Sequence, residues 1–106
     1  AGSADLTPDA LASVNREVLP QLEIAQGMLV RVEGNTDAFG DRRANQTLSE
    51  RRARAIVDYL ITRGISPKRV MARGNGSGNP IAPNGSAEGR AQNRRTDILF
   101  IRRQAG

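Results

Sequence analysis

Apolar residues recur at helical spacing in the first quarter of the chain. Thr7, Pro8 and Asp9 predict a helix start, because an N-capping side chain, a proline in the first turn and an early acid all favour one. The apolar positions that follow are three to four residues apart: Leu11, Val14, Val18, Leu22 and Ala25. We expect Pro20 to kink this helix or to end it near Leu19.

The middle of the chain contains a strand pattern and a second helix pattern. Apolar and polar residues alternate over residues 28–34, which predicts a half-buried strand. A polar loop is expected over residues 35–46. The next helix is predicted to begin at the capping-box pair Thr47 and Glu50 and to end at Gly64. One apolar stripe runs along it: Ala53, Ile56, Val57, Leu60 and Ile61.

The last third predicts a short strand over 69–73, a Gly/Asn/Pro-rich loop over 74–85, one helical turn within 86–92 and a strand over 95–102. The last strand carries apolar residues on both faces, which is typical of a central strand. The order α, β, α, β, β predicts an α/β (α+β) two-layer sandwich with the helices on one face of a mixed sheet. Because three strands make a thin sheet, a further strand is expected before Ala1.

Composition narrows the possible chemistry. A chain of 106 residues, 38% of them hydrophobic, suits a single domain over 1–106 with one modest core. It has no cysteine and no histidine, so it lacks thiolates, the commonest metal ligand and the commonest general base. We therefore expect no catalytic residue, metal or cofactor. No apolar run approaches the ~20 residues that cross a bilayer, so the domain itself is expected to be soluble.

The charge balance favours an anionic partner. The net charge is +5, from 16 basic and 11 acidic residues, and every basic residue except Lys68 is an arginine. Nucleic acid is the alternative partner that such a charge suggests. However, the only aromatics are Phe39, Tyr59 and Phe100, and none is interleaved with a basic run for base stacking. Nucleic-acid binding is therefore the weaker hypothesis.

Two other patterns are weaker still. The glycine-rich run 74–79 resembles a nucleotide-binding loop, but Asn79 replaces its third required glycine, so a flexible loop is favoured. Glu33, Asp37 and Asp41 could form a metal site or an acid pair, yet one lies in a strand and another in a loop of undefined course. A metal centre or a hydrolase is therefore disfavoured.

An acid and an arginine are expected on one rim of the sheet. Asp37 directly follows the predicted strand 28–34, and Arg52 is placed one turn into the next helix. On the helical wheel Arg51 falls opposite the apolar stripe, whereas Arg52 lies on its flank with Asn45. A carboxylate beside a guanidinium can bind a zwitterion, such as the free end of an amino acid. The spacing equally allows Asp37 and Arg52 to pair with each other.

Three segments carry a resemblance to a known family: VRVEGNTD at 30–37, NQTLSERRA at 45–53 and EGRAQNRR at 88–95. They resemble the OmpA C-terminal (OmpA/MotB/Pal-like) domain. Its pattern is a strand ending in G-[HN]-T-D, then N-x-x-L-S-x-x-R-A on a helix, then N-R-R before the last strand. The resemblance extends from about residue 6 to residue 101. It implies a β-α-β-α-β-β sandwich, of whose first strand only a remnant at 1–4 could be present.

The resemblance implies non-catalytic binding of peptidoglycan through the meso-diaminopimelate of its stem peptide, which would anchor a Gram-negative envelope protein to the cell wall. Asp37 would take the ammonium of the diaminopimelate side chain and Arg52 its carboxylate. The other implied site residues support Asp37, shape the pocket or close it: Thr36, Asn45, Leu48, Asn93 and Arg94. The implied location is the periplasm, with the parent protein tethered to the outer or inner membrane by regions outside this chain.

The chain departs from the family pattern at Asn35, where many members have histidine. Asparagine keeps hydrogen-bonding ability without a charge that varies with pH. We therefore expect ligand binding that depends little on pH near neutrality.

Overall fold

A computed structural model describes residues 6–102 of the chain, and its three strands form one mixed sheet. The strands are β1 (Met28–Gly34), β2 (Val70–Gly74) and β3 (Thr96–Arg102). The order in the sheet is β2-β1-β3, with β1 parallel to β2 and antiparallel to β3. Each strand begins within one residue of its predicted start.

β1, and not β3, is central in the sheet formed by residues 6–102. The prediction of a central last strand is therefore wrong for this sheet. Ile98 and Phe100 lie beside the buried Val32 and Val30, while the alternate residues of β3 face the opposite side. Apolar residues on both faces indicate burial above and below a strand, but they do not report its hydrogen-bonding neighbours. The strand expected before Ala1 and the remnant at 1–4 lie outside the described residues.

The N-terminal helical stretch has three consecutive elements: α1 (Pro8–Ser13), the π-helical turn η1 (Val14–Val18) and α2 (Leu19–Ile24). Thr7 Oγ1 accepts the N–H of Ala10 at 3.1 Å, which confirms the predicted N-cap. Pro20 does not end the helix near Leu19. The backbone widens just before the proline, where the N–H of Leu19 reaches the carbonyl of Val14, and then continues as α2. Pro20 thus lies in the first turn of α2, where its missing N–H costs little.

The long helix α3 (Arg42–Thr62) begins five residues before its predicted start. Asp41 is its N-cap and accepts a backbone N–H of the first turn at 2.8 Å, so Thr47 and Glu50 lie inside the helix. The capping-box prediction is wrong because the first turn is exposed and no apolar stripe marks it. The predicted C-terminal stop is confirmed at Gly64, whose φ of 94° suits a residue without a side chain.

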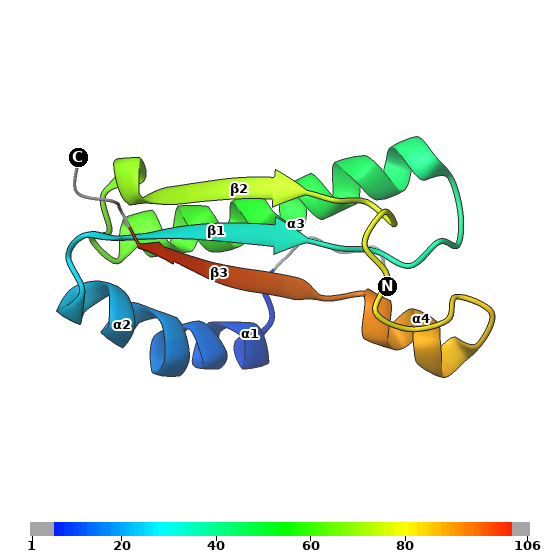
Figure 1. Cartoon of the computed structure of the whole chain (residues 1–106), viewed down its shortest axis with the longest axis horizontal. Helices are drawn as coiled ribbons and strands as arrows, with labels where there is room; N and C mark the ends of the chain where they lie inside the picture. Colours follow the sequence, from blue (N-terminus) through cyan, green and yellow to red (C-terminus); the bar gives the residue numbers. More distant parts are fainter. Residues whose placement is uncertain (1–5, 103–106) are drawn as a thin grey trace.

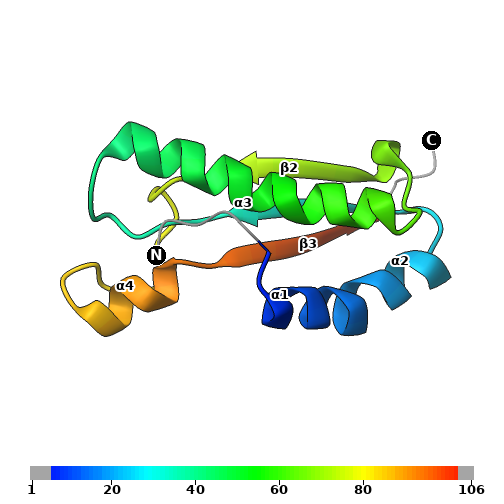
Figure 2. The ribbon, with the colours of Figure 1, turned by 180° about the vertical axis from the view of Figure 1, so that it is seen from behind.

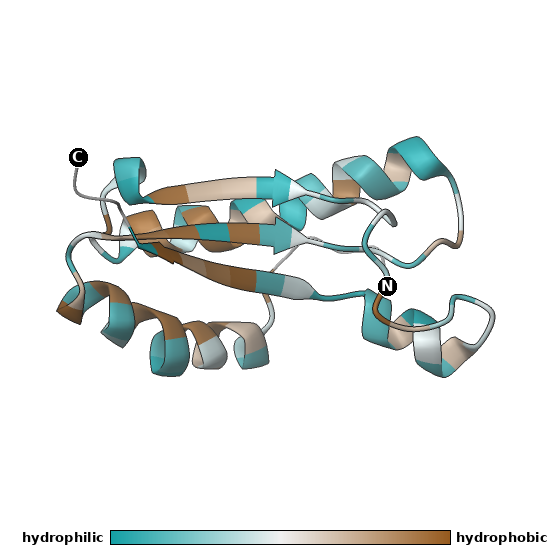
Figure 3. Cartoon of the chain, in the orientation of Figure 1, coloured by the Kyte–Doolittle hydropathy of each residue, from teal (hydrophilic) through white to brown (hydrophobic). Residues whose placement is uncertain are grey.

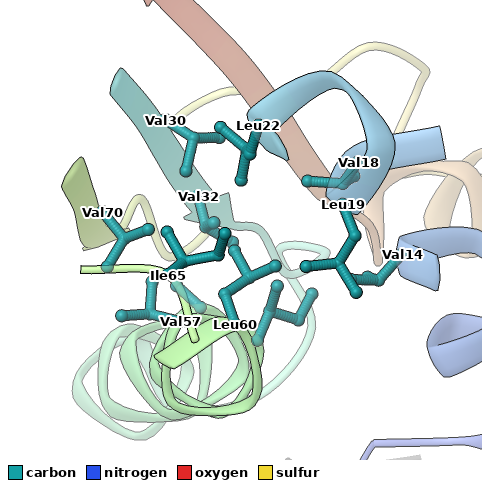
Figure 4. Close-up of a cluster of buried hydrophobic side chains, with 12 residues drawn as sticks. Val14, Val18, Leu19, Leu22, Val30, Val32, Val57, Leu60, Ile65 and Val70 are labelled. Carbon is teal, nitrogen blue, oxygen red and sulfur yellow. The ribbon is translucent and has the colours of Figure 1, made fainter. Parts of the chain in front are cut away.

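The helices α1–α2 and α3 cover one face of the sheet, which confirms the two-layer arrangement (Figures 1 and 2). Their apolar side chains meet Val30 and Val32 of β1, both fully buried (Figure 4). Burial of each such side chain stabilises the fold by about 1.5–3 kcal/mol. The other buried core residues are Val14, Val18, Leu19, Leu22, Ala53, Ile56, Val57, Leu60, Ile65 and Val70.

A polar end of the molecule lies beyond the tip of β1. There α4 (Ala87–Asn93), which is longer than the predicted single turn, lies at the same end of the molecule as the end of β1 and the start of α3 (Figure 1). Figure 3 shows this end mostly in teal and white, whereas brown residues follow the strands and the helices beside them. The 3-10 turn η2 (Pro67–Arg69) precedes β2 at the other end. None of the helices between residues 6 and 102 is long and apolar enough to cross a bilayer.

Candidate functional site

The chain leaves β1 through three buried polar residues, Asn35, Thr36 and Asp37. The N–H of Asn35 donates to the carbonyl of Arg95 and the N–H of Thr36 to that of Gly76, both at 2.8 Å. The segment is therefore held from both sides beyond the last strand residues. This places Asp37, which is only 9% exposed, at a defined position at the end of the sheet.

The side chain of Asn35 joins three parts of the chain. Its Nδ2 donates to Oδ2 of Asp97 at 3.2 Å and to the carbonyl of Arg95 at 3.3 Å, while its Oδ1 accepts from Asn75 at 3.1 Å. The network uses both the donor and the acceptor of the amide. An amide does not titrate, so the side chain of Asn35 itself keeps the same donor and acceptor at every pH.

Asp37 forms an ion pair with Arg94, whose Nη1 lies 2.6 Å from Oδ2. The other carboxylate oxygen accepts the N–H of Phe39 at 2.9 Å. Burial by itself would raise the pKa of Asp37, but these hydrogen bonds and the charges of Arg94 and Arg90 hold that pKa below its ordinary value. Asp37 is therefore ionised at neutral pH. This ion pair joins residues 57 positions apart in the sequence, and Arg52 lines the same cavity.

Asn45 and Leu48 face the same space from α3. Asn45 Nδ2 donates to the carbonyl of Phe39 at 3.0 Å and to that of Asp37 at 3.4 Å. The amide thereby fixes the backbone of the loop that carries the carboxylate. Thr36 also supports this loop, because its Oγ1 donates to the Asp37 carbonyl at 2.9 Å.

Arg52 reaches the site from farther along α3 than predicted. Because α3 begins at Arg42, Arg52 lies about three turns into the helix and not one. Its Nη1 donates to the carbonyl of Asn35 at 3.4 Å. Burial lowers the pKa of Arg52, as does the charge of Arg94, but a guanidinium stays protonated in proteins. Arg51, predicted to be solvated, is exposed.

One cavity of about 410 Å³ brings six of the seven predicted site residues together: Thr36, Asp37, Asn45, Leu48, Arg52 and Arg94. Phe39 and Arg90 also line it and were missed by the sequence reasoning. Arg90 precedes Arg94 by four residues on α4, so the i, i+4 spacing within EGRAQNRR was an available signal. Phe39 is 78% exposed, and an aromatic residue in an otherwise polar loop was the signal for it.

Asn93, the seventh predicted residue, is fully buried and lies outside the cavity lining. Its Oδ1 accepts the N–H groups of Ile81 and Ala82 at 2.8 and 3.1 Å. Its Nδ2 donates to the carbonyl of Ala82 and to Oδ1 of Asn84, both at 2.9 Å. The side chain of Asn93, the residue before Arg94, thus holds the loop that precedes α4.

The acidic residues considered as metal ligands have other partners. Glu33 accepts from Arg31 at 2.6 Å and from Asn75 at 2.8 Å, and the hydrogen bond from Asn75 is the largest cause of its lowered pKa. Asp41 caps α3. Between residues 6 and 102, no group of three histidine, cysteine or acidic side chains is placed to hold a metal ion.

The sequence of this chain is similar to a family model and to proteins of known name. A sequence model of the OmpA family matches residues 1–94. Outer membrane protein A of Bordetella avium is 41% identical over 102 residues, which cover 92% of this chain and 52% of that protein. The peptidoglycan-binding protein ArfA of Mycobacterium bovis is 40% identical over 96 residues, covering 91% of this chain and 29% of that protein. The chain therefore spans about half or less of the length of these relatives.

A solved structure has the same fold. The crystal structure of the peptidoglycan-associated lipoprotein from Burkholderia pseudomallei matches with a TM-score of 0.85 and 25% sequence identity. The match covers 93% of this chain and 83% of that one.

Proposed function

The chain belongs to the OmpA family, and on this premise we propose that it binds peptidoglycan without catalysis, through the diaminopimelate of the stem peptide. The observation that carries the proposal is the cavity at the end of β1. There a buried carboxylate and several guanidinium groups face one space. The names of two relatives, ArfA and the peptidoglycan-associated lipoprotein, support the choice of ligand.

The chemistry of the cavity suits the amino-acid end of diaminopimelate. Each oxygen of the Asp37 carboxylate already accepts one hydrogen bond, but a carboxylate offers about four acceptor positions. The carboxylate can therefore still accept from an ammonium group. The guanidinium of Arg52 would take the ligand carboxylate, and Leu48 would contact the aliphatic part of the side chain.

The same proposal includes a location and a role. Two relatives are named as an outer membrane protein and a lipoprotein. We place this domain in the periplasm, where it would hold an envelope protein to the wall, with tethering regions outside the 106 residues. The nucleic-acid alternative is not favoured by the cavity, because Phe39 is the one aromatic residue among the described residues that line it and successive bases would have no aromatic surface on which to stack.

A calorimetric titration with two stem peptides tests the proposed function. The 106-residue chain should bind a diaminopimelate tripeptide saturably, and should bind the same peptide with lysine in place of diaminopimelate at least about tenfold more weakly. Lysine keeps the ammonium but lacks the side-chain carboxylate that Arg52 would bind. Equal affinity for the two peptides, or no binding of either, would overturn the proposal.

Affinity for the diaminopimelate peptide should change by less than about threefold between pH 6 and pH 8. The chain has no histidine, and the pKa of Asp37 is held below its ordinary value, so no site residue changes charge in this range. Binding should be lost only in acid, as the pH falls through the lowered pKa of Asp37. Titrations at a series of pH values measure this, and a tenfold change between pH 6 and 8 contradicts the expectation.

A further inference from the structure

The cavity at the end of β1 carries more positive charge than one zwitterion uses. Its lining has one carboxylate, that of Asp37, and the guanidinium groups of Arg52, Arg90 and Arg94, so three cations face one anion. The amino-acid end of diaminopimelate brings one ammonium and one carboxylate, and its binding leaves the excess unchanged. A ligand with a further negative charge would therefore complement the cavity better.

Arg90 is the cation that the proposed diaminopimelate contacts do not use. It is half-buried on α4, one turn before Arg94. Its Nη1 donates to the carbonyl of Asn84 at 2.9 Å, and no carboxylate in residues 6–102 lies within ion-pair distance of it. A carbonyl accepts a hydrogen bond but does not neutralise a guanidinium. Arg90 therefore keeps its charge and further N–H donors for a ligand.

Asn84 holds Arg90 in a defined position relative to Asp37. Its carbonyl accepts from Arg90, while its Oδ1 accepts from the N–H of Ala38 at 3.1 Å and from Asn93 at 2.9 Å. One residue thus ties α4 to the loop that follows the carboxylate. A guanidinium fixed in this way loses little conformational freedom when it binds a ligand.

Resting on the proposed diaminopimelate site, we propose that Arg90 binds a second carboxylate of the same stem peptide, so that the site recognises two carboxylates and not one. A stem tripeptide offers two candidates: the α-carboxylate of the preceding γ-linked glutamate, and the carboxylate at the chain end, which belongs to the peptide-linked end of diaminopimelate itself. Both offer a guanidinium the same pair of parallel hydrogen bonds. Amidation of either group removes its charge with little change in size.

Three synthetic tripeptides distinguish the two sources: Ala-γGlu-diaminopimelate with both carboxylates free, its glutamate α-amide and its C-terminal amide. One of the amides should bind the wild-type 106-residue chain about 10- to 100-fold more weakly than the free peptide, and the other should bind like the free peptide. Arg90→Gln should weaken the free peptide by a similar factor. The amidation that weakens binding to the wild type should cause no further loss of affinity in Arg90→Gln, because both changes would remove the same contact.

The controls distinguish a direct contact between Arg90 and the peptide from long-range attraction by the positive charge of the whole domain. Arg51→Gln removes the same charge from an exposed position of α3 outside the cavity, and should bind every peptide within about twofold of the wild type. The effect of amidation is measured with the wild-type chain, so this comparison does not depend on how well a variant folds. If neither amide weakens binding, or if the losses from amidation and Arg90→Gln add, the second contact is overturned while the diaminopimelate site stands. If the free tripeptide binds no better than its lysine analogue, both proposals fail.

Discussion

Asp37→Asn is expected to weaken binding of the diaminopimelate tripeptide by about 30-fold or more, because one partner of a buried charge pair is neutralised. Asparagine keeps the shape of the side chain and an oxygen that can accept the N–H of Phe39. It loses the charge that would bind an ammonium. Arg52, Arg90 and Arg94 then line the cavity without a carboxylate, so a cationic group on the ligand is repelled. Calorimetric titration measures the loss.

The fold of Asp37→Asn should survive. Its free energy of unfolding should fall by about 1 kcal/mol, because 36% of the Arg94 side chain is exposed and water can solvate the released guanidinium. Asp41→Asn is the matched control: it removes the same charge nearby, and asparagine caps a helix as well as aspartate does. The control should bind within about twofold of the wild type. Normal binding by Asp37→Asn, or an equal loss in Asp41→Asn, contradicts the role given to Asp37.

Gly34→Ala is expected to lower the free energy of unfolding by about 3 kcal/mol and the melting temperature by about 10 °C or more. A Cβ at this position would clash with the carbonyl oxygen of Ser49 and lie 2.9 Å from its carbonyl carbon and 3.3 Å from the nitrogen of Ala53. These are backbone atoms of α3, so no rotamer change relieves the clash and β1 must move away from the helix. Because Asp37 follows β1 and Arg52 lies on α3, the same displacement should also weaken peptide binding.

Gly27→Ala provides the control for this substitution. A Cβ at Gly27 meets no atom within 4 Å, so the variant should unfold within about 0.5 kcal/mol of the wild type. Thermal and urea denaturation of both variants measure the difference. If Gly34→Ala is as stable as Gly27→Ala, the close approach of β1 and α3 is not what positions the site.

Much of the candidate site could be predicted because its residues lie in short local patterns. Asp37 follows a strand whose alternation is clear, and Asn45, Leu48 and Arg52 recur at helical spacing on one face of α3. Error in the start of α3 did not change that face, since spacing within a helix is independent of where the helix begins. Thr36, Leu48, Asn93 and Arg94 were implied as site residues by the family motif alone, although Leu48 lies on the face of α3 that carries Arg52.

Contacts across the chain could not be predicted. The ion pair between Asp37 and Arg94 depends on where α4 stands relative to β1, and nothing in either segment specifies that distance. Arg90 was missed for the same reason, although its spacing from Arg94 was visible. Asn93 was implied as a site residue, but its side-chain amide forms hydrogen bonds with the loop at 81–84. The residues next to Asn93 in the sequence do not indicate the course of that loop.

The sequence by itself determined the helix cap at Thr7, the strand at 28–34, the end of α3 at Gly64 and the two-layer class of the fold. These depend on backbone preferences and on the period of apolar residues, which act within a few positions of one another. The tertiary structure alone decided that β1 is central among the described strands and which charges meet in the cavity. Such choices depend on the free energy of packing segments that are far apart in the chain, and local patterns do not carry that information.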